Sequence, residues 1–110
     1  MEIQFSDYAF KIKAEDGKQV IFDHLRKKWL VLTPEEWVRQ HILHYLTDDH
    51  GFPASLISIE KKLRVFGLSR RTDVVLYNRT MQPVLIVECK AGEVRIDEKF
   101  LSRSPGIILH

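Results

Sequence analysis

Two carboxylates and one ammonium group lie at the ends of two neighbouring apolar runs. Asp73 precedes the run 74–77, and Glu88 and Lys90 follow the run 84–87. β-branched and aromatic residues favour strands, and the Asn and Pro of the segment between the runs favour a chain reversal. We therefore predict an antiparallel hairpin in which Asp73 lies opposite Glu88, so that the two carboxylates and Lys90 converge.

The position of Glu88 favours a functional role for this group. Glu88 follows four consecutive apolar residues, which is typical of a strand buried on both faces. An ionised side chain there is costly unless a metal ion or Lys90 pairs with it. The alternative is that Asp73 is a turn residue and that Glu88 and Lys90 mark the solvated end of a strand.

Cys89 alternates with Glu88 and Lys90 and is expected to point to the opposite face of the strand. It is the only cysteine of the chain, so an internal disulfide and a thiolate metal cluster within one chain are both excluded. We expect a small, buried, apolar filler.

An aspartate that opens one strand of a hairpin, followed by Glu-X-Lys that closes the next, resembles the signature of the PD-(D/E)XK nuclease superfamily. Asp73, Glu88 and Lys90 occupy the signature positions. Thr72 stands where a proline often precedes the aspartate.

A longer stretch, from Leu32-Thr-Pro-Glu-Glu-Trp-Val-Arg-Gln40 through Val87-Glu-Cys-Lys-Ala91, resembles the N-terminal nuclease domain of type I restriction enzyme R proteins, in its small stand-alone bacterial version. The resemblance runs from the first hairpin to Val94. It implies an α/β (α+β) fold with a restriction-endonuclease-like core, in which a central mixed β-sheet is flanked by helices. It also implies metal-dependent DNA cleavage, with DNA and restriction-modification subunits as partners.

The resemblance assigns roles to individual residues. Asp73, Glu88 and the backbone carbonyl of Cys89 would bind Mg²⁺, with Mn²⁺ as a substitute, and Lys90 would orient or activate a metal-bound water. A glutamate from the preceding helix often joins the metal site in this superfamily, which points to Glu35 or Glu36.

A helix is predicted to start at Thr33, because Thr33-Pro34-Glu35-Glu36 fits a capping box with proline at the first helical position. Residues at helical spacing predict an apolar stripe that packs on the sheet. With about 100° between successive residues, Glu35 lies beside that stripe and Glu36 is turned toward solvent. The stripe comprises Val38, His41, Ile42, Tyr45 and Leu46.

Two further β segments are predicted. Asp-Gly at 16–17 between two apolar runs predicts an N-terminal hairpin. The alternation of 56–65 predicts a strand, the first of the central sheet. Five basic residues with no acidic residue among them lie just before Asp73, and we expect them to contact DNA phosphates. They are Lys61, Lys62, Arg64, Arg70 and Arg71.

A chain of 110 residues, with 45% of them hydrophobic, is expected to form a single domain, 1–110. It comprises a hairpin extension (1–30), a core (33–94) and an atypical tail (95–110). Residues 91–100, which lead into the tail, are expected to form a loop with a short helical start, and residues 107–109 a short strand at the end. The second helix that usually follows in this family has no counterpart after Lys90, so the C-terminal part of the core is expected to be truncated.

The chain has no long apolar run and no signal-like start, so we expect a cytoplasmic protein without a membrane partner. The net charge of +2 is too small to identify a nucleic-acid partner by itself. The alternatives to a nuclease are a non-catalytic nucleic-acid-binding module that retains the fold and a subunit active only within a restriction complex. A homodimer is also a candidate.

Overall fold

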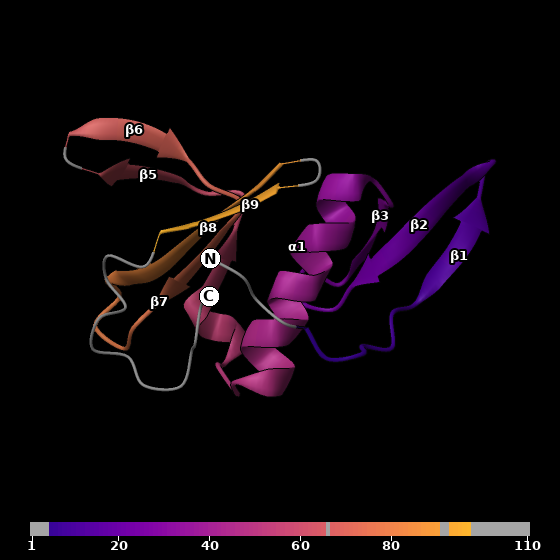
Figure 1. Ribbon diagram of the computed structural model, residues 1–110, viewed down its shortest axis with the longest axis horizontal. Helices are drawn as coiled ribbons and strands as arrows, with labels where there is room; N and C mark the ends of the chain where they lie inside the picture. Colours follow the sequence, from indigo (N-terminus) through magenta and orange to yellow (C-terminus); the bar gives the residue numbers. More distant parts are fainter. Residues whose placement is uncertain (1–4, 66, 91–92, 98–110) are drawn as a thin grey trace.

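The structure is a computed structural model that describes residues 5–65, 67–90 and 93–97. Its described strands form three antiparallel sheets, and one α-helix lies between the N-terminal sheet and the four-stranded central sheet (Figure 1). The predicted α/β class is therefore confirmed. The predicted mixed sheet is wrong for the described strands, since all their pairings are antiparallel. No described helix is long and apolar enough to cross a membrane.

The N-terminal sheet contains β1 (Ile12–Glu15), β2 (Lys18–Asp23) and β3 (Lys28–Val31) in that spatial order. The predicted Asp-Gly turn joins β1 to β2, and both turn residues have positive φ, at 50° and 76°. Two-residue turns in which both central residues have positive φ match the twist of the flanking strands, and Asp-Gly is favoured in hairpins because it accepts these angles. The predicted hairpin is confirmed, and β3 extends it to three strands.

Helix α1 (Pro34–His44) begins where the sequence predicts. Thr33 is the N-cap, and its hydroxyl oxygen accepts a hydrogen bond from the Glu36 N–H at 3.0 Å. This bond satisfies one of the amide groups that lack a partner in the first turn of a helix. A π-helical turn, Tyr45–Asp49, continues the helix.

The central sheet has the spatial order β4 (Ile57–Ile59), β7 (Val74–Tyr77), β8 (Pro83–Lys90), β9 (Glu93–Asp97). The predicted hairpin is confirmed as β7–β8, with Val74 paired to Val87. The predicted loop with a short helical start is wrong at residues 93–97. These residues form a strand that pairs along β8. The rest of the predicted tail, 98–110 with its strand at 107–109, lies outside the described residues.

The strand predicted over 56–65 is interrupted at Glu60, and this prediction is wrong. Glu60 has a φ of 55°, a left-handed conformation that ends β4. The chain then enters a separate two-stranded hairpin of β5 (Lys62–Val65) and β6 (Leu68–Arg71). A simple alternation of apolar and polar residues cannot reveal such a break, because the residues on both sides keep the strand pattern.

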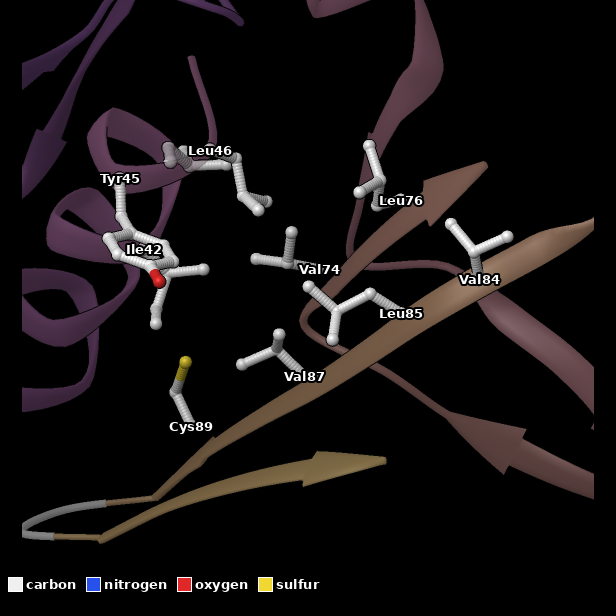
Figure 2. Packing of buried hydrophobic residues seen from close by; sticks show 10 residues of the cluster. Ile42, Tyr45, Leu46, Val74, Leu76, Val84, Leu85, Val87 and Cys89 are labelled. Atoms are coloured by element: carbon white, nitrogen blue, oxygen red, sulfur yellow. The ribbon is translucent and has the colours of Figure 1, made fainter. Parts of the chain in front are cut away.

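The main core lies between α1 and one face of the central sheet. Figure 2 shows side chains of the helical segment, Ile42 and Leu46 among them, facing Val74, Leu85 and Val87 of the sheet. The opposite face of the sheet carries a smaller cluster of Val75, Tyr77 and Ile86, with Leu63 packed against it.

A second side of α1 is covered by an N-terminal aromatic segment. Phe10 packs on Trp37 and His41, with ring centroids 5.0 and 4.7 Å apart. Phe5 and Tyr8 also contact His41. The helix is thus buried on two sides, and the predicted apolar stripe combines residues from both.

Leu46 provides a test of this packing. It is fully buried in the main core, whereas Leu68 on β6 is 74% exposed. We expect Leu46→Ala to lower the free energy of unfolding by about 2–5 kcal/mol, because it removes buried methyl groups and leaves a cavity. The control Leu68→Ala should change it by less than about 0.5 kcal/mol. Urea unfolding measures both, and equal effects would contradict the described core.

Candidate active site

Asp73 lies just before β7, at the position next to the Val74–Val87 pair. Its N–H donates at 3.0 Å to the carbonyl of Val87, the residue that Val74 faces in the register. One carboxylate oxygen accepts the backbone N–H of Cys89 at 2.5 Å. The carboxylate therefore lies beside β8 and takes the place of the backbone carbonyl that a longer neighbouring strand would supply. The register of β7 with β8 begins at Val74 and Val87, so the position of Asp73 opposite Glu88 stays a prediction.

Cys89 is buried among the helix-facing core residues, as predicted (Figure 2). Burial, followed by the nearby Asp73 charge, raises the pKa of its thiol to about 12. The thiol is therefore neutral at ordinary pH, and packing is its role. Glu88 is half-buried, and the alternation of β8 places it on the face opposite Cys89. Lys90 ends β8, and its side chain lies outside the described residues.

Arg39 of α1 connects Asp73 to the rest of the site. Its side chain is 8% exposed and donates to three carboxylates: Glu36 at 2.9 Å, Glu60 at 2.9 Å and Asp73 at 3.1 Å. Burial by itself lowers the pKa of Arg39, but these carboxylates raise it more, so that it lies above its ordinary value. The planar guanidinium suits this role, because its donors are fixed in a fork.

Glu60 precedes the β5–β6 hairpin in the chain, and Asp73 follows it. Arg39 therefore binds residues at both ends of that hairpin. The Glu60 N–H also donates to the Asp73 carbonyl at 2.9 Å. The buried Thr72 closes the base further, since both its N–H and its hydroxyl donate to the Lys61 carbonyl, at 2.9 and 2.6 Å. The hairpin is thus anchored to α1 at its base.

A second guanidinium, from Arg26, extends the network toward the N-terminal sheet. Arg26 donates to Asp23 at 2.7 Å and to Glu36 at 3.3 Å, and lies 3.5 Å from Glu60. The buried amide of Gln40 bridges Asp23 and Glu36, with both distances at 3.0 Å. The network therefore joins the N-terminal sheet, α1 and the start of β7.

The two glutamates of the first helical turn are placed the opposite way from the prediction. Glu35 is exposed, whereas Glu36 is buried and bound by Arg39, Arg26 and Gln40. The reason is that the predicted stripe includes His41 and Tyr45, which contact Phe10 and Phe5 of the aromatic segment. The buried side of α1 carries Glu36, Arg39, Gln40, Ile42 and Leu43, and three of these five residues are polar or charged. Whether either glutamate binds a metal stays a prediction.

Sequence reasoning missed Arg39, Gln40, Arg26 and Asp23. The available signal was the spacing of Glu36, Arg39 and Gln40, which places them together on one side of a helix. A charged pair three residues apart usually marks a solvated helix face, so this signal alone does not indicate burial.

The site is rich in carboxylate oxygens, the ligand type that hard divalent cations prefer. Four carboxylates face the two guanidinium groups of the network, an excess of two negative charges. Asp73 is 25% exposed at its side chain, and each carboxylate oxygen that accepts one hydrogen bond retains a lone pair. In the described part of the chain, no group of three His, Cys, Asp or Glu side chains is arranged to hold a metal ion. Mg²⁺, however, commonly uses one or two carboxylates and keeps several waters.

The β5–β6 hairpin presents the predicted basic residues beside this site. Lys62 pairs with Arg71 and Arg64 with Ser69, so these three cations share one face, and all three are exposed. Lys61 is also exposed and lies over the Tyr77 ring, 5.0 Å from its centroid. The side chain of Arg70 is outside the described residues.

Comparison with known protein families identifies one match. A model of the type I restriction enzyme R protein N terminus matches residues 34–104, which is more than half of the chain. No curated protein and no solved structure matches the chain. The matched range contains α1, the basic hairpin, Asp73 and Glu88, and starts after the N-terminal sheet.

We expect Arg39→Met to destabilise the protein by roughly 3–5 kcal/mol, because it leaves buried carboxylates without their cation. Arg79→Met, at an exposed position, is the control and should change stability by less than about 0.5 kcal/mol. Chemical denaturation with matched buffers measures both. A loss equal to that of the control would mean that the Arg39 contacts contribute nothing to folding.

The network also predicts a pH dependence. Burial raises the pKa of Asp23, but hydrogen bonds from Arg26 and Gln40 outweigh it, so the pKa lies below its ordinary value. The stabilisation by ionised Asp23 is therefore present above the unfolded-state pKa of about 3.9, and is lost as the pH falls through the folded-state pKa. We expect Asp23→Asn to be less stable than the parent at neutral pH. The two denaturation curves should converge in acid, and a difference independent of pH would contradict this.

Proposed function

Because the chain belongs to the family of type I restriction enzyme R protein N-terminal domains, we propose that it is a metal-dependent DNA endonuclease with a role in a restriction system. The observation that carries the proposal is the contact of the Asp73 carboxylate with the N–H of Cys89, the residue after Glu88 on β8, directly beside the basic β5–β6 hairpin. Acidic metal ligands next to basic phosphate contacts are what hydrolysis of a polyanion requires.

Asp73, Glu88 and the Cys89 carbonyl would hold Mg²⁺, or Mn²⁺ in its place. The Cys89 N–H points toward Asp73, and in an extended strand the N–H and C=O of one residue point to the same side. The carbonyl is thus expected on the Asp73 side of β8. The bound ion would lower the pKa of a water and offset the charge that develops on the phosphate. Lys90, two residues after Glu88 at the end of β8, would orient that water.

Glu36 supports the site indirectly in this proposal. Its carboxylate is bound by Arg39, which in turn holds Asp73. Glu36 thus acts as a positioning residue for Asp73, and Glu35, which is exposed, is the glutamate free of this network. A direct ligand role for Glu36 would require Arg39 to give up its contact.

The exposed face of Lys62, Arg64 and Arg71 would bind the DNA backbone. Arg39 sets the orientation of this face relative to Asp73, because it binds Glu60 and Asp73 at the two ends of the hairpin. Phosphates bound along this face would lead toward the carboxylates. Contacts of this kind position DNA without reading its sequence.

The second candidate is a nucleic-acid-binding module without turnover. The basic hairpin favours it, because binding by that face needs neither Glu88 nor Lys90. Restriction-modification subunits as partners are compatible with both candidates, and so is cleavage that begins only when such a subunit is added.

Two variants test the nuclease proposal. Glu88→Gln removes one charge at nearly constant volume, so Mg²⁺ affinity measured by calorimetry should fall. Lys90→Ala should abolish single-turnover cleavage with Mn²⁺ while metal and DNA binding persist, because an ammonium group cannot bind a cation. The control Lys27→Ala, at an exposed position, should behave like the parent.

The outcomes separate the two candidates. Unchanged Mg²⁺ affinity in Glu88→Gln would exclude Glu88 as a ligand. DNA binding by the parent without cleavage of linear, supercoiled or single-stranded DNA, with and without a partner subunit, would favour the binding module.

A further inference from the structure

The outer face of the N-terminal sheet carries aromatic rings that α1 does not cover. Register pairs Phe22 with Trp29 and Val20 with Val31, so these four side chains share one face. The other face carries Ile21 and Asp23, both fully buried, and Asp23 is bonded to Gln40 of α1. The face with the rings therefore points away from the helix.

The two rings form a small platform that solvent reaches. Their centroids are 5.3 Å apart in an edge-to-face arrangement. Trp29 is 37% exposed and its neighbour Val31 is 49% exposed. Residues of this size are usually covered in a monomer, and an uncovered group of them on one face suggests a binding surface.

Lysine side chains lie over this platform. The Lys13 ammonium is 4.3 Å from the Trp29 ring centroid, and the Lys11 ammonium is 5.6 Å from that of Phe22. Pairing with Glu15 places Lys18 on the same face. Three cations thus accompany one carboxylate, that of Glu15 at the tip of the hairpin, which lies 3.8 Å from the Lys13 ammonium at an exposed position. The face combines exposed rings with positive charge.

We propose that this outer face binds unpaired nucleotides of single-stranded nucleic acid. Every base has a π-face that can stack on an exposed aromatic ring, and the phosphates on either side of it need cations nearby. Here each ring has its own lysine within a few ångströms. A base that stacks on Trp29 displaces the Lys13 ammonium from the ring, and the adjoining phosphate becomes its new partner.

Charge complementarity favours nucleic acid over a protein partner. A protein interface core is depleted in charged residues and in lysine above all, whereas this platform has lysines directly over its rings. The surface is also separate from Asp73 and Glu88 in the central sheet, so its binding should need no metal ion.

The chain has two tryptophans, Trp29 and Trp37, which makes a direct optical test feasible. In the Trp37→Phe variant, Trp29 is the sole tryptophan. We expect an oligothymidylate, added in EDTA at low salt, to quench its fluorescence. In the converse variant, Trp29→Phe, Trp37 on α1 is the sole tryptophan. We expect this variant still to bind the oligothymidylate but to show little quenching.

Two further comparisons assign the binding to this face. Trp29→Ala should weaken oligothymidylate binding by roughly 5- to 140-fold, which corresponds to loss of one stacked base. Lys13→Ala should reduce the salt dependence by about 0.7 unit of slope. Lys28→Ala is the matched control, because Lys28 is exposed but pairs with Asp23 on the other face, and it should have little effect. Circular dichroism and melting curves establish that each variant is folded.

Several results would overturn the proposal. One is the absence of Trp29 quenching, and another is an effect of Lys28→Ala as large as that of Lys13→Ala. Quenching by duplex DNA as strong as by the single strand would also do so. Self-association that Trp29→Ala abolishes would assign the face to a second copy of the chain. Since EDTA is present throughout, none of these results depends on the nuclease proposal.

Discussion

The buried guanidinium of Arg39 is the interaction on which the arrangement of the site depends. It joins α1 to Glu60 and Asp73, and those residues flank the basic hairpin and precede the central strand β7. An arginine in this place costs desolvation energy, which is offset only when its donors meet acceptors of good geometry. Three carboxylates near 3 Å provide those acceptors. One side chain therefore sets the relation among three elements.

The interface between α1 and the rest of the protein is accordingly divided into two parts. Toward its C-terminal end the helix packs through apolar side chains such as Ile42 and Leu46 on the central sheet (Figure 2). Toward its N-terminal end it contacts the sheets through Glu36, Arg39 and Gln40. Apolar burial supplies most of the stabilisation and is nondirectional. The ionic part adds direction, because a displaced strand or hairpin would leave charges unpaired.

The ionic part contains more carboxylates than guanidinium groups, and this excess of negative charge bears on the function of the site. A purely structural network would tend toward balanced charge, since an uncompensated buried charge is costly. Here two of the four carboxylates reach solvent, Glu60 with 49% and Asp73 with 25% of the side chain exposed, and the adjacent hairpin carries the opposite charge on its exposed face. The family, the carboxylates and the basic hairpin all favour a nucleic-acid substrate. The aromatic face of the N-terminal sheet adds a second surface of suitable chemistry at a distance from the carboxylates.

Much of the local structure could be predicted from the sequence. The Thr33 cap, the Asp-Gly turn and the β7–β8 hairpin are all confirmed. Each depends on residues close together in the chain, where capping, turn conformation and strand alternation operate. The burial of Cys89 followed from the same alternation.

Only the tertiary structure decided the burial of Glu36, the break at Glu60 and the pairing of β9 with β8. Arg39 meets Glu60 and Asp73 across 21 and 34 residues, a separation over which no periodic pattern carries information. The sequence alone determined that Glu36 lies in the first turn of α1. A glutamate at such a position is normally solvated. Its burial required a cation from the next turn, acceptors from two other segments and a sheet to exclude water. These conditions exist only in the folded chain, because each charge is tolerated in the interior only when all its partners are in place.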